Sequence, residues 1–262
     1  MRGALIATSA ALYIFLFVLT APRAHLSGLL GPLPAHLLGV SVKVLPALLL
    51  SVFPARAHPR GRFSVHASRV SIALLLSAAG DALMDFCERT ELGGEAAFLG
   101  GLGTFLLAHL FYCAGFLSTV ERHSAPVALV TAFPSALVLK ALSPHILGGK
   151  DASLFPAVCV YVAVITSMLY LSVVRGANGA RGYWLTVGGA ALFLFSDAVL
   201  AWDKFAPPPR VASSGAVRWW FRAPKVLVMA SYYGAQALLA SGAAAKGAEE
   251  EGRVERTGKK HI

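Results

Sequence analysis

Two stretches of this chain place aspartates inside otherwise apolar sequence, LLSAAGDALMDF at residues 75–86 and LFLFSDAVLAWDKF at residues 192–205. The tetrapeptides around Asp81 (GDAL) and Asp197 (SDAV) are closely similar. An acid within a membrane-spanning helix costs about 2.5–3.5 kcal/mol by insertion scales, so such residues are rare and usually mark a transport pathway, a proton relay or a catalytic site. These two aspartates are therefore the first candidates for function.

The composition around these stretches indicates a membrane protein. Of the 262 residues, 56% are hydrophobic and 14% are charged, and the mean hydropathy is +0.66. Segments of roughly 20 apolar residues can cross the hydrocarbon core. Eight such windows occur, at 4–21, 35–54, 67–86, 97–120, 125–145, 152–174, 182–202 and 223–242. We therefore predict an all-α, polytopic membrane protein of about eight spans, with one membrane domain at 1–242 and a disordered cytosolic tail at 243–262.

The charge distribution predicts which side of the membrane holds the termini. With eight spans both termini share a side, and more of the 23 lysines and arginines fall on that side than on the other, which favours cytosolic termini. The chain ends Lys259-Lys260-His261-Ile262, which is similar to the dilysine signal that returns membrane proteins to the endoplasmic reticulum. The alternative is a charged tail with no targeting role. The net charge of +10 suits cytosolic loops facing anionic lipid, and it does not indicate nucleic-acid binding, because no soluble basic fold carries it.

The positions of the two aspartates along their spans are alike. Each lies about five residues before the end of its span, in the third and the seventh span, which run in the same direction. Both carboxylates are therefore expected at similar depth, in the half of the membrane opposite the termini. Because the two stretches are four spans apart, a four-plus-four internal repeat is a second expectation.

Other polar residues in the predicted spans are spaced so that they share a helix face, as residues three, four or seven apart do. Such faces could line a common cavity. They carry Lys43 in the second span, Asp81, Asp85 and Glu88 in the third, His109 and Tyr112 in the fourth, Asp197 and Lys204 in the seventh, and Tyr232, Tyr233 and Gln236 in the eighth. Each of these residues also has a purely structural interpretation. The tyrosines could be packing residues, and His109 could form a hydrogen bond between helices. Lys43 could be a counter-ion, Asp85, Glu88 and Lys204 could be solvated charges at span ends, and Asp81 and Asp197 could belong to a buried salt bridge.

Five blocks of the chain carry a resemblance to a known family: VKVLP at 42–46, SAAGD at 77–81, FLLAHLFY at 105–112, FSDAVLAWDKF at 195–205 and YYGAQ at 232–236. In this order, from about residue 40 to 242, they resemble the lysoplasmalogenase family, the YhhN-like or transmembrane protein 86 group, and look most like its vertebrate B-type members. Asp85 stands where relatives look apolar, which argues against a special role for it.

The resemblance implies hydrolysis of the sn-1 vinyl ether bond of choline or ethanolamine lysoplasmalogens to a fatty aldehyde and glycerophosphocholine or glycerophosphoethanolamine, with no cofactor and no metal. Vinyl ethers break when their β-carbon is protonated and water captures the resulting oxocarbenium ion. One carboxylic acid and one carboxylate suffice for this chemistry. Two nearby carboxylates resist double ionisation and tend to share a proton. Asp81 and Asp197 are thus predicted to divide the acid and base roles, in an order that the sequence leaves open.

The remaining polar residues are predicted to position the substrate. Lys43 could bind the lipid phosphate, since an ammonium is a competent partner for it. We assign His109 with Tyr112, and Tyr232 and Tyr233 with Gln236, to water or the glycerol oxygens. The expected partners are a lysophospholipid and the bilayer, and a homodimer is compatible with the sequence.

Three other readings of the aspartates compete with this one. A zinc hydrolase could use Asp81, His109 and Asp197, but the histidines lack the HxxxH or HExxH spacing of zinc sites. An intramembrane aspartyl protease would need Gly-x-Gly-Asp where the chain has Ala78-Ala79-Gly80-Asp81. From another class, a proton-coupled lipid transporter or a lipid sensor would also place acids and prolines within spans.

Overall fold

The computed structural model describes residues 31–56, 65–87, 94–120, 122–176, 181–206 and 215–258. Within these residues the regular structure is helical, apart from one isolated β-bridge between Val120 and Arg175. The helices are α3 (Pro32–Ser51), α4 (Phe53–Arg56), α5 (Val65–Cys87), α6 (Gly94–Leu117), α7 (Ala125–Leu147), the short 3-10 helix η2 (Ala152–Leu154), α8 (Phe155–Val174), α9 (Arg181–Phe205) and α10 (Gly215–Gly258). The prediction of an all-α fold is confirmed.

Seven of the described helices are long and apolar enough to cross a bilayer: α3, α5, α6, α7, α8, α9 and α10. They correspond to the second to eighth predicted spans, and the first predicted span, at 4–21, lies outside the described residues. Pro46 lies inside α3, and Pro134 and Pro144 inside α7. Membrane helices tolerate such prolines because neighbouring helices and side chains satisfy the freed backbone groups. The chain is a polytopic membrane protein.

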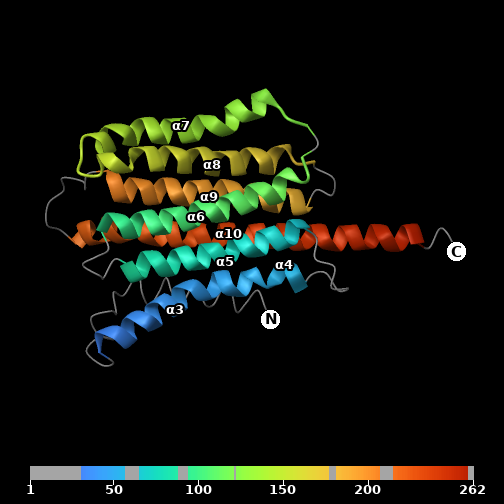
Figure 1. The fold of residues 1–262 in the computed structure, drawn as a ribbon, viewed down its shortest axis with the longest axis horizontal. Helices are drawn as coiled ribbons and strands as arrows, with labels where there is room; N and C mark the ends of the chain where they lie inside the picture. The colour runs from blue at the N-terminus through green and yellow to red at the C-terminus, as the bar shows by residue number, and fades with distance from the viewer. Residues whose placement is uncertain are drawn as a thin grey trace.

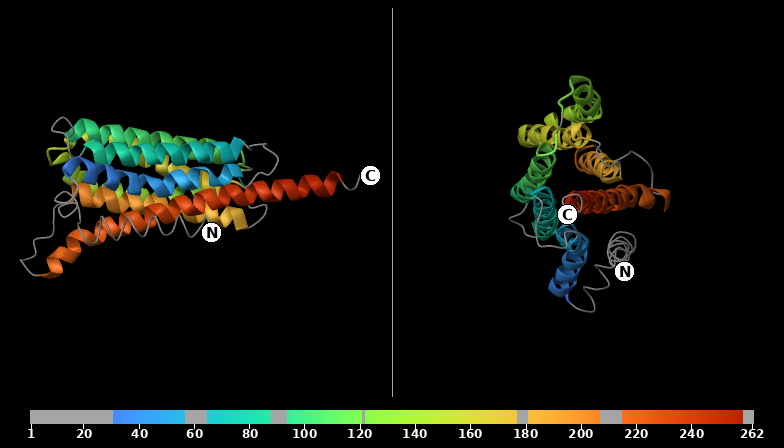
Figure 2. Two further views of the ribbon diagram at one scale, coloured as in Figure 1. Left: turned by 90° about the horizontal axis from the view of Figure 1, so that it is seen from below. Right: turned by 90° about the vertical axis from the view of Figure 1, so that its right-hand side faces the viewer.

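Six helices pack in a closed order, which we call the six-helix ring. Helix α3 packs on α5, α5 on α6, α6 on α8, α8 on α9 and α9 on α10, and α10 returns to α3 and α5. The helices run side by side along the length of the molecule (Figure 1), and the end-on view places α7 at the edge of the bundle, where it contacts α8 and α9 (Figure 2). Side chains fill the interior of the ring, among them the fully buried Leu74, Tyr112, Phe193 and Met168.

The contacts within the ring occur in matching pairs. Helix α3 packs on α5 as α8 packs on α9, and α5 packs on α6 as α9 packs on α10. Between the two halves, α6 contacts α8, and α10 correspondingly contacts α3. This is the neighbour pattern expected of a four-plus-four repeat, in which α3, α5 and α6 are equivalent to α8, α9 and α10.

Helix α10 runs into the segment that the sequence analysis assigns to a cytosolic tail, 243–262. Helix α10 continues to Gly258 and extends beyond the other helices (Figure 1). The span supplies a helix that is already nucleated, and the following sequence is rich in alanine, glutamate, lysine and arginine, which have high helix propensity. Extending an existing helix through such residues costs little, and this explains why a charged segment stays helical.

Candidate active site

Each helix of the six-helix ring contributes a polar residue to the interior. These residues are Lys43 on α3, Asp81 on α5, His109 on α6, Tyr161 on α8, Asp197 on α9 and Tyr232 on α10. Asp81, Lys43 and Tyr232 are buried, and His109 is fully buried. Polar groups so deep in an apolar bundle need partners, and most of them find one on another helix.

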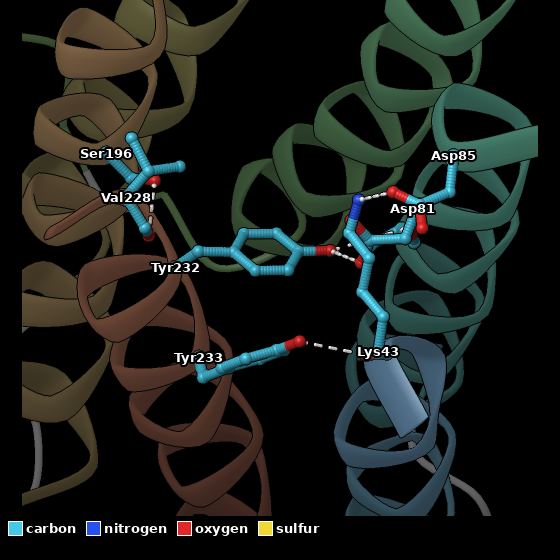
Figure 3. A network of polar contacts seen from close by, with 8 residues as sticks. Lys43, Asp81, Asp85, Ser196, Val228, Tyr232 and Tyr233 are labelled. Atoms are coloured by element: carbon cyan, nitrogen blue, oxygen red, sulfur yellow. Dashed lines mark hydrogen bonds and ion pairs between the residues drawn. The ribbon is translucent and has the colours of Figure 1, made fainter. Parts of the chain in front are cut away.

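Asp81 is held by two different groups (Figure 3). The Lys43 ammonium lies 3.6 Å from its Oδ1, and the Tyr232 hydroxyl donates a hydrogen bond of 2.7 Å to its Oδ2. The same ammonium donates to Oδ1 of Asp85 at 3.1 Å. Lys43 therefore lies between two buried carboxylates that are one helical turn apart on α5.

The neighbouring tyrosine of α10 fixes the position of Lys43. Tyr233 donates a hydrogen bond of 2.9 Å to the backbone carbonyl of Lys43, and Figure 3 shows Tyr232 and Tyr233 both reaching from α10 towards α3 and α5. On the other side of α10, the Ser196 hydroxyl donates to the Val228 carbonyl at 3.2 Å and joins α9 to α10. The aspartate, its lysine and both tyrosines thus share one hydrogen-bonded network across three helices.

Asp197 has a different environment. Its Oδ2 accepts a hydrogen bond of 2.5 Å from the Tyr161 hydroxyl of α8. In the part of the chain that the structure describes, no lysine, arginine or histidine forms a salt bridge with it. Asp81 and Asp197 therefore have unlike partners.

A chain of aromatic rings connects the two halves of the site. His109 packs edge-on against Phe193, with ring centroids 4.7 Å apart, and against Tyr161 at 5.3 Å. Phe193 in turn meets Tyr232 at 5.4 Å. The ring order Tyr232, Phe193, His109, Tyr161 leads from the partner of Asp81 to the partner of Asp197.

Several buried hydrogen-bonding groups of the site lack a partner among the described residues. His109 donates from Nδ1 to the Phe105 carbonyl at 2.6 Å, and its Nε2 has no such partner. Both polar atoms of the fully buried Gln236 amide also have none. The buried hydroxyls of Tyr112 and Ser77 form no hydrogen bond with a described residue either. Unpaired buried groups of this kind are candidates for binding water or substrate oxygens.

The structure brings most of the predicted residues together. Lys43, Asp81, Tyr232 and Tyr233 form direct contacts, His109 and Tyr112 line the adjoining aromatic cluster, and Asp197 joins through Tyr161. Lys204, which shares a predicted helix face with Asp197, is exposed, and its ammonium lies 4.8 Å from the centre of the Phe98 ring. Glu88 lies outside the described residues.

Two residues of the site have roles that the sequence analysis does not give them. Asp85, which was expected to be a solvated span end without a special role, is buried and binds Lys43. Tyr161 is missing from the candidates altogether. The internal repeat could have indicated it, because Tyr161 precedes Asp197 by 36 residues and Lys43 precedes Asp81 by 38.

The arrangement of possible metal ligands does not reproduce the zinc alternative. Among the described residues, no group of three or more histidine, cysteine, aspartate or glutamate side chains could hold a metal ion. Asp81, His109 and Asp197 are therefore not assembled as a ligand set. Cys113 and Cys159 are free thiols within α6 and α8.

The fold and its interior define a polytopic membrane protein whose helix ring holds two aspartates, Asp81 buried and Asp197 half-buried. The chain belongs to the YhhN family, whose model matches residues 38–243. This confirms the resemblance found in the five sequence blocks.

Curated relatives of the chain share a name. The pig protein lysoplasmalogenase TMEM86B is 33% identical over 203 residues, which cover 77% of this chain and 73% of the relative. Its human counterpart is 31% identical over 200 residues, covering 76% and 72%. A Mycobacterium bovis protein named lysoplasmalogenase is 34% identical over 197 residues, covering 73% and 69%. No solved structure matches the chain.

Proposed function

We propose that this protein is a lysoplasmalogenase, an ether hydrolase that cleaves the sn-1 vinyl ether bond of choline or ethanolamine lysoplasmalogens. The products are a fatty aldehyde and glycerophosphocholine or glycerophosphoethanolamine. The observation that carries the proposal is the pair of aspartates inside the six-helix ring, in a family whose curated members bear this name. The lysophospholipid substrate reaches the site from the bilayer in which the protein lies.

The residues of the site suit this chemistry. Protonation of the vinyl ether β-carbon needs an acid, and the oxocarbenium ion that follows needs a nearby negative charge and a water molecule. Asp81 and Asp197 can supply the acid and the charge. The unpaired His109 Nε2 and the Gln236 amide are suitable for orienting the water or the glycerol oxygens, with Tyr112 beside them.

The role of Lys43 in binding the substrate phosphate is a separate proposal. Its ammonium contacts Asp81 and Asp85, so the contacts described here support a counter-ion role. If Lys43 also binds the phosphate, Lys43→Gln should raise the KM for lysoplasmalogen. An unchanged KM would leave only the counter-ion role.

Turnover by the purified protein in detergent tests the function. We expect aldehyde release from lysoplasmalogen, with no release of fatty acid from an ester lysolipid and no loss of activity on chelation. Because detergent solution holds no gradient, aldehyde release would also favour catalysis over transport or sensing.

Variants of the two aspartates test the site. Asp81→Asn and Asp197→Asn should each lower kcat by about 10²–10⁴-fold, the usual contribution of a general acid or base. Asp203→Asn, at an exposed position on α9, is the matched control and should keep full activity. An active Asp81→Asn/Asp197→Asn double variant would refute the proposed site.

We also propose an endoplasmic reticulum location with cytosolic termini, for which the Lys259-Lys260 pair and the charge distribution are the support. Residues 259–262 lie outside the described part of the chain. Lys259→Ser/Lys260→Ser should move the protein from the endoplasmic reticulum to later compartments, as seen by microscopy, and an unchanged location would remove the dilysine argument. Homodimerisation stays a prediction, which light scattering of the purified protein would check.

A further inference from the structure

The two aspartates of the site have unlike partners, and this difference bears on which of them acts as the acid. Asp81 has an ammonium and a phenol beside it, whereas Asp197 has a phenol alone. The inference rests on the proposed function and concerns the division of roles within the same site.

The surroundings of Asp81 favour its ionised form. In a low-dielectric interior an unpaired charge is very costly, and an opposite charge within a few ångströms offsets much of this cost. Lys43 provides that charge, and the Tyr232 hydroxyl donates to the other carboxylate oxygen. A carboxylate with both oxygens engaged in this way is suited to stabilise a cation and to accept a proton from water.

The Lys43 ammonium also lies closer to Asp85 than to Asp81, at 3.1 Å against 3.6 Å. The Lys43–Asp85 contact therefore holds the ammonium in place without cancelling the charge of Asp81.

The surroundings of Asp197 favour the neutral acid. Within the described residues its one hydrogen bond comes from Tyr161, and no cation pairs with it. A further ionised carboxylate inside the ring, with no cation beside it, would be costly. Oδ2 of a protonated Asp197 can still accept the Tyr161 hydrogen bond, which leaves Oδ1 to carry the proton.

The repeat gives this difference a structural basis. Asp81 on α5 and Asp197 on α9 occupy equivalent positions of the two halves, and so do the helices α3 and α8 that precede them. From these preceding helices Asp81 receives the Lys43 ammonium, and Asp197 receives the Tyr161 phenol. The two halves thus share the order of neighbouring helices, while the groups that face the two aspartates differ.

We propose that Asp197 is the general acid, that Asp81 is the carboxylate that stabilises the cation and serves as base, and that Tyr161 is the residue that positions Asp197. Asp197 gives its proton to the β-carbon, and the vinyl double bond becomes an oxocarbenium ion next to Asp81. Water adds to the carbon that bears the ether oxygen and loses a proton to Asp81, which gives a hemiacetal. On collapse, Asp197 takes the hemiacetal hydroxyl proton and Asp81 returns its proton to the departing glycerol oxygen. Both aspartates end in their starting states, with one water consumed.

Binding of two stable analogues tests the division of roles without turnover. One probe is a 1-O-alkyl lysophospholipid, which is uncharged at the sn-1 oxygen, and the other has a secondary amine in place of that oxygen, so that its ammonium stands in for the oxocarbenium ion. The wild-type protein should bind the amine more tightly than the ether. Asp197→Asn should keep this preference, and Asp81→Asn should lose it by about tenfold or more, as expected when a charge pair is removed.

The other outcomes would overturn the assignment. They are loss of the preference in Asp197→Asn but not in Asp81→Asn, loss in both, or loss in neither. Equal affinity for the uncharged ether shows that each variant is folded. Both variants should fold, because Asp81→Asn leaves Lys43 paired with Asp85, and Asp197→Asn removes no salt-bridge partner among the described residues. If the wild-type protein released no aldehyde, the proposed function would fail, and the binding test would still report which aspartate is charged.

A tyrosine pair tests the positioning role of Tyr161. Tyr161→Phe should lower kcat by about tenfold and leave KM unchanged, because the lost hydrogen bond orients the acid and does not hold the substrate. Tyr183→Phe is the matched control, since Tyr183 donates to the Val173 carbonyl, away from both aspartates. A kcat equal to that of the control, or an effect confined to KM, would overturn the role of Tyr161.

Discussion

Lys43 shows how far single residues could be understood from the sequence. An ammonium within a span must have a partner, and either a counter-ion role or a phosphate-binding role followed from that requirement. Helical spacing placed Asp85 on the same face as Asp81, but it could not show that α3 packs on this face and brings Lys43 to both. Asp85 and Tyr161 were missed for this reason: their roles depend on contacts between helices.

The first prediction concerns the stability of the Lys43 contacts. Removing one partner of a buried charge pair leaves an uncompensated charge and costs about 3–5 kcal/mol. Lys43→Met should therefore lower the Tm of the protein in detergent clearly, whereas Lys140→Met, at an exposed position on α7, should change it little. Lys43→Met/Asp85→Asn should recover part of the loss, because it removes one of the two stranded carboxylates. Equal Tm values for the two single lysine variants would contradict the buried salt bridges.

At the scale of helices, the spans could be predicted closely and their ends less well. The window 67–86 corresponds to α5 at Val65–Cys87, and 152–174 corresponds to η2 and α8. An apolar run of this length has to cross the hydrocarbon, and only a helix or a closed barrel satisfies its backbone there. Helix α10, Gly215–Gly258, is longer than the predicted span at 223–242. The prediction used the apolar composition alone, and it did not consider that a helix can continue from the span into the charged residues that follow.

The second prediction concerns the packing of α9 on α10, which carry Asp197 and Tyr232. These helices approach through small residues: a Cβ on Gly189 would lie 2.8 Å from Leu239 Cγ and 3.0 Å from the Ala235 carbonyl oxygen. Membrane helices associate through such close contacts. Gly189→Ala should cost about 1–3 kcal/mol of stability, the usual range for overpacking, and should lower activity by displacing Tyr232.

Gly103→Ala is the matched control for this prediction. Gly103 lies within α6, and a Cβ there would meet nothing within 4 Å. Since alanine favours helices more than glycine does, this control should be neutral or slightly stabilising. A Gly189→Ala variant with the same Tm and activity as Gly103→Ala would show that α9 and α10 pack less closely than described.

At the scale of the whole molecule, the sequence indicated a repeat but not the closed order of the helices. The similarity of the two aspartate stretches predicted that α5 and α9 are equivalent. Which helices lie side by side depends on packing between small residues and on shape, and an apolar span presents much the same surface on every side. The contacts of α6 with α8 and of α10 with α3, which close the ring around the site, could therefore be seen only in the structure.

The third prediction concerns how the ring lies across the membrane. The bridge between Val120 and Arg175 places the loop before α7 and the loop after α8 at one end of the molecule, and α7 runs from that end to the other. Arg122 and Lys150, both exposed, flank α7 at these opposite ends. With cytosolic termini, eight alternating spans place Arg122 in the cytosol and Lys150 in the lumen.

Single cysteines at these two sites, in a protein with Cys87, Cys113 and Cys159 replaced, test this orientation. In sealed microsomes, whose outer face is cytosolic, a membrane-impermeant maleimide should label Arg122→Cys directly and Lys150→Cys only after permeabilisation. The reverse pattern would place the termini in the lumen, and the dilysine sequence could then not act as a retrieval signal. Labelling of both sites without permeabilisation would mean that α7 does not cross the bilayer. The spans that carry Asp81 and Asp197 would then run in opposite directions, and the two aspartates would not be expected at the same depth.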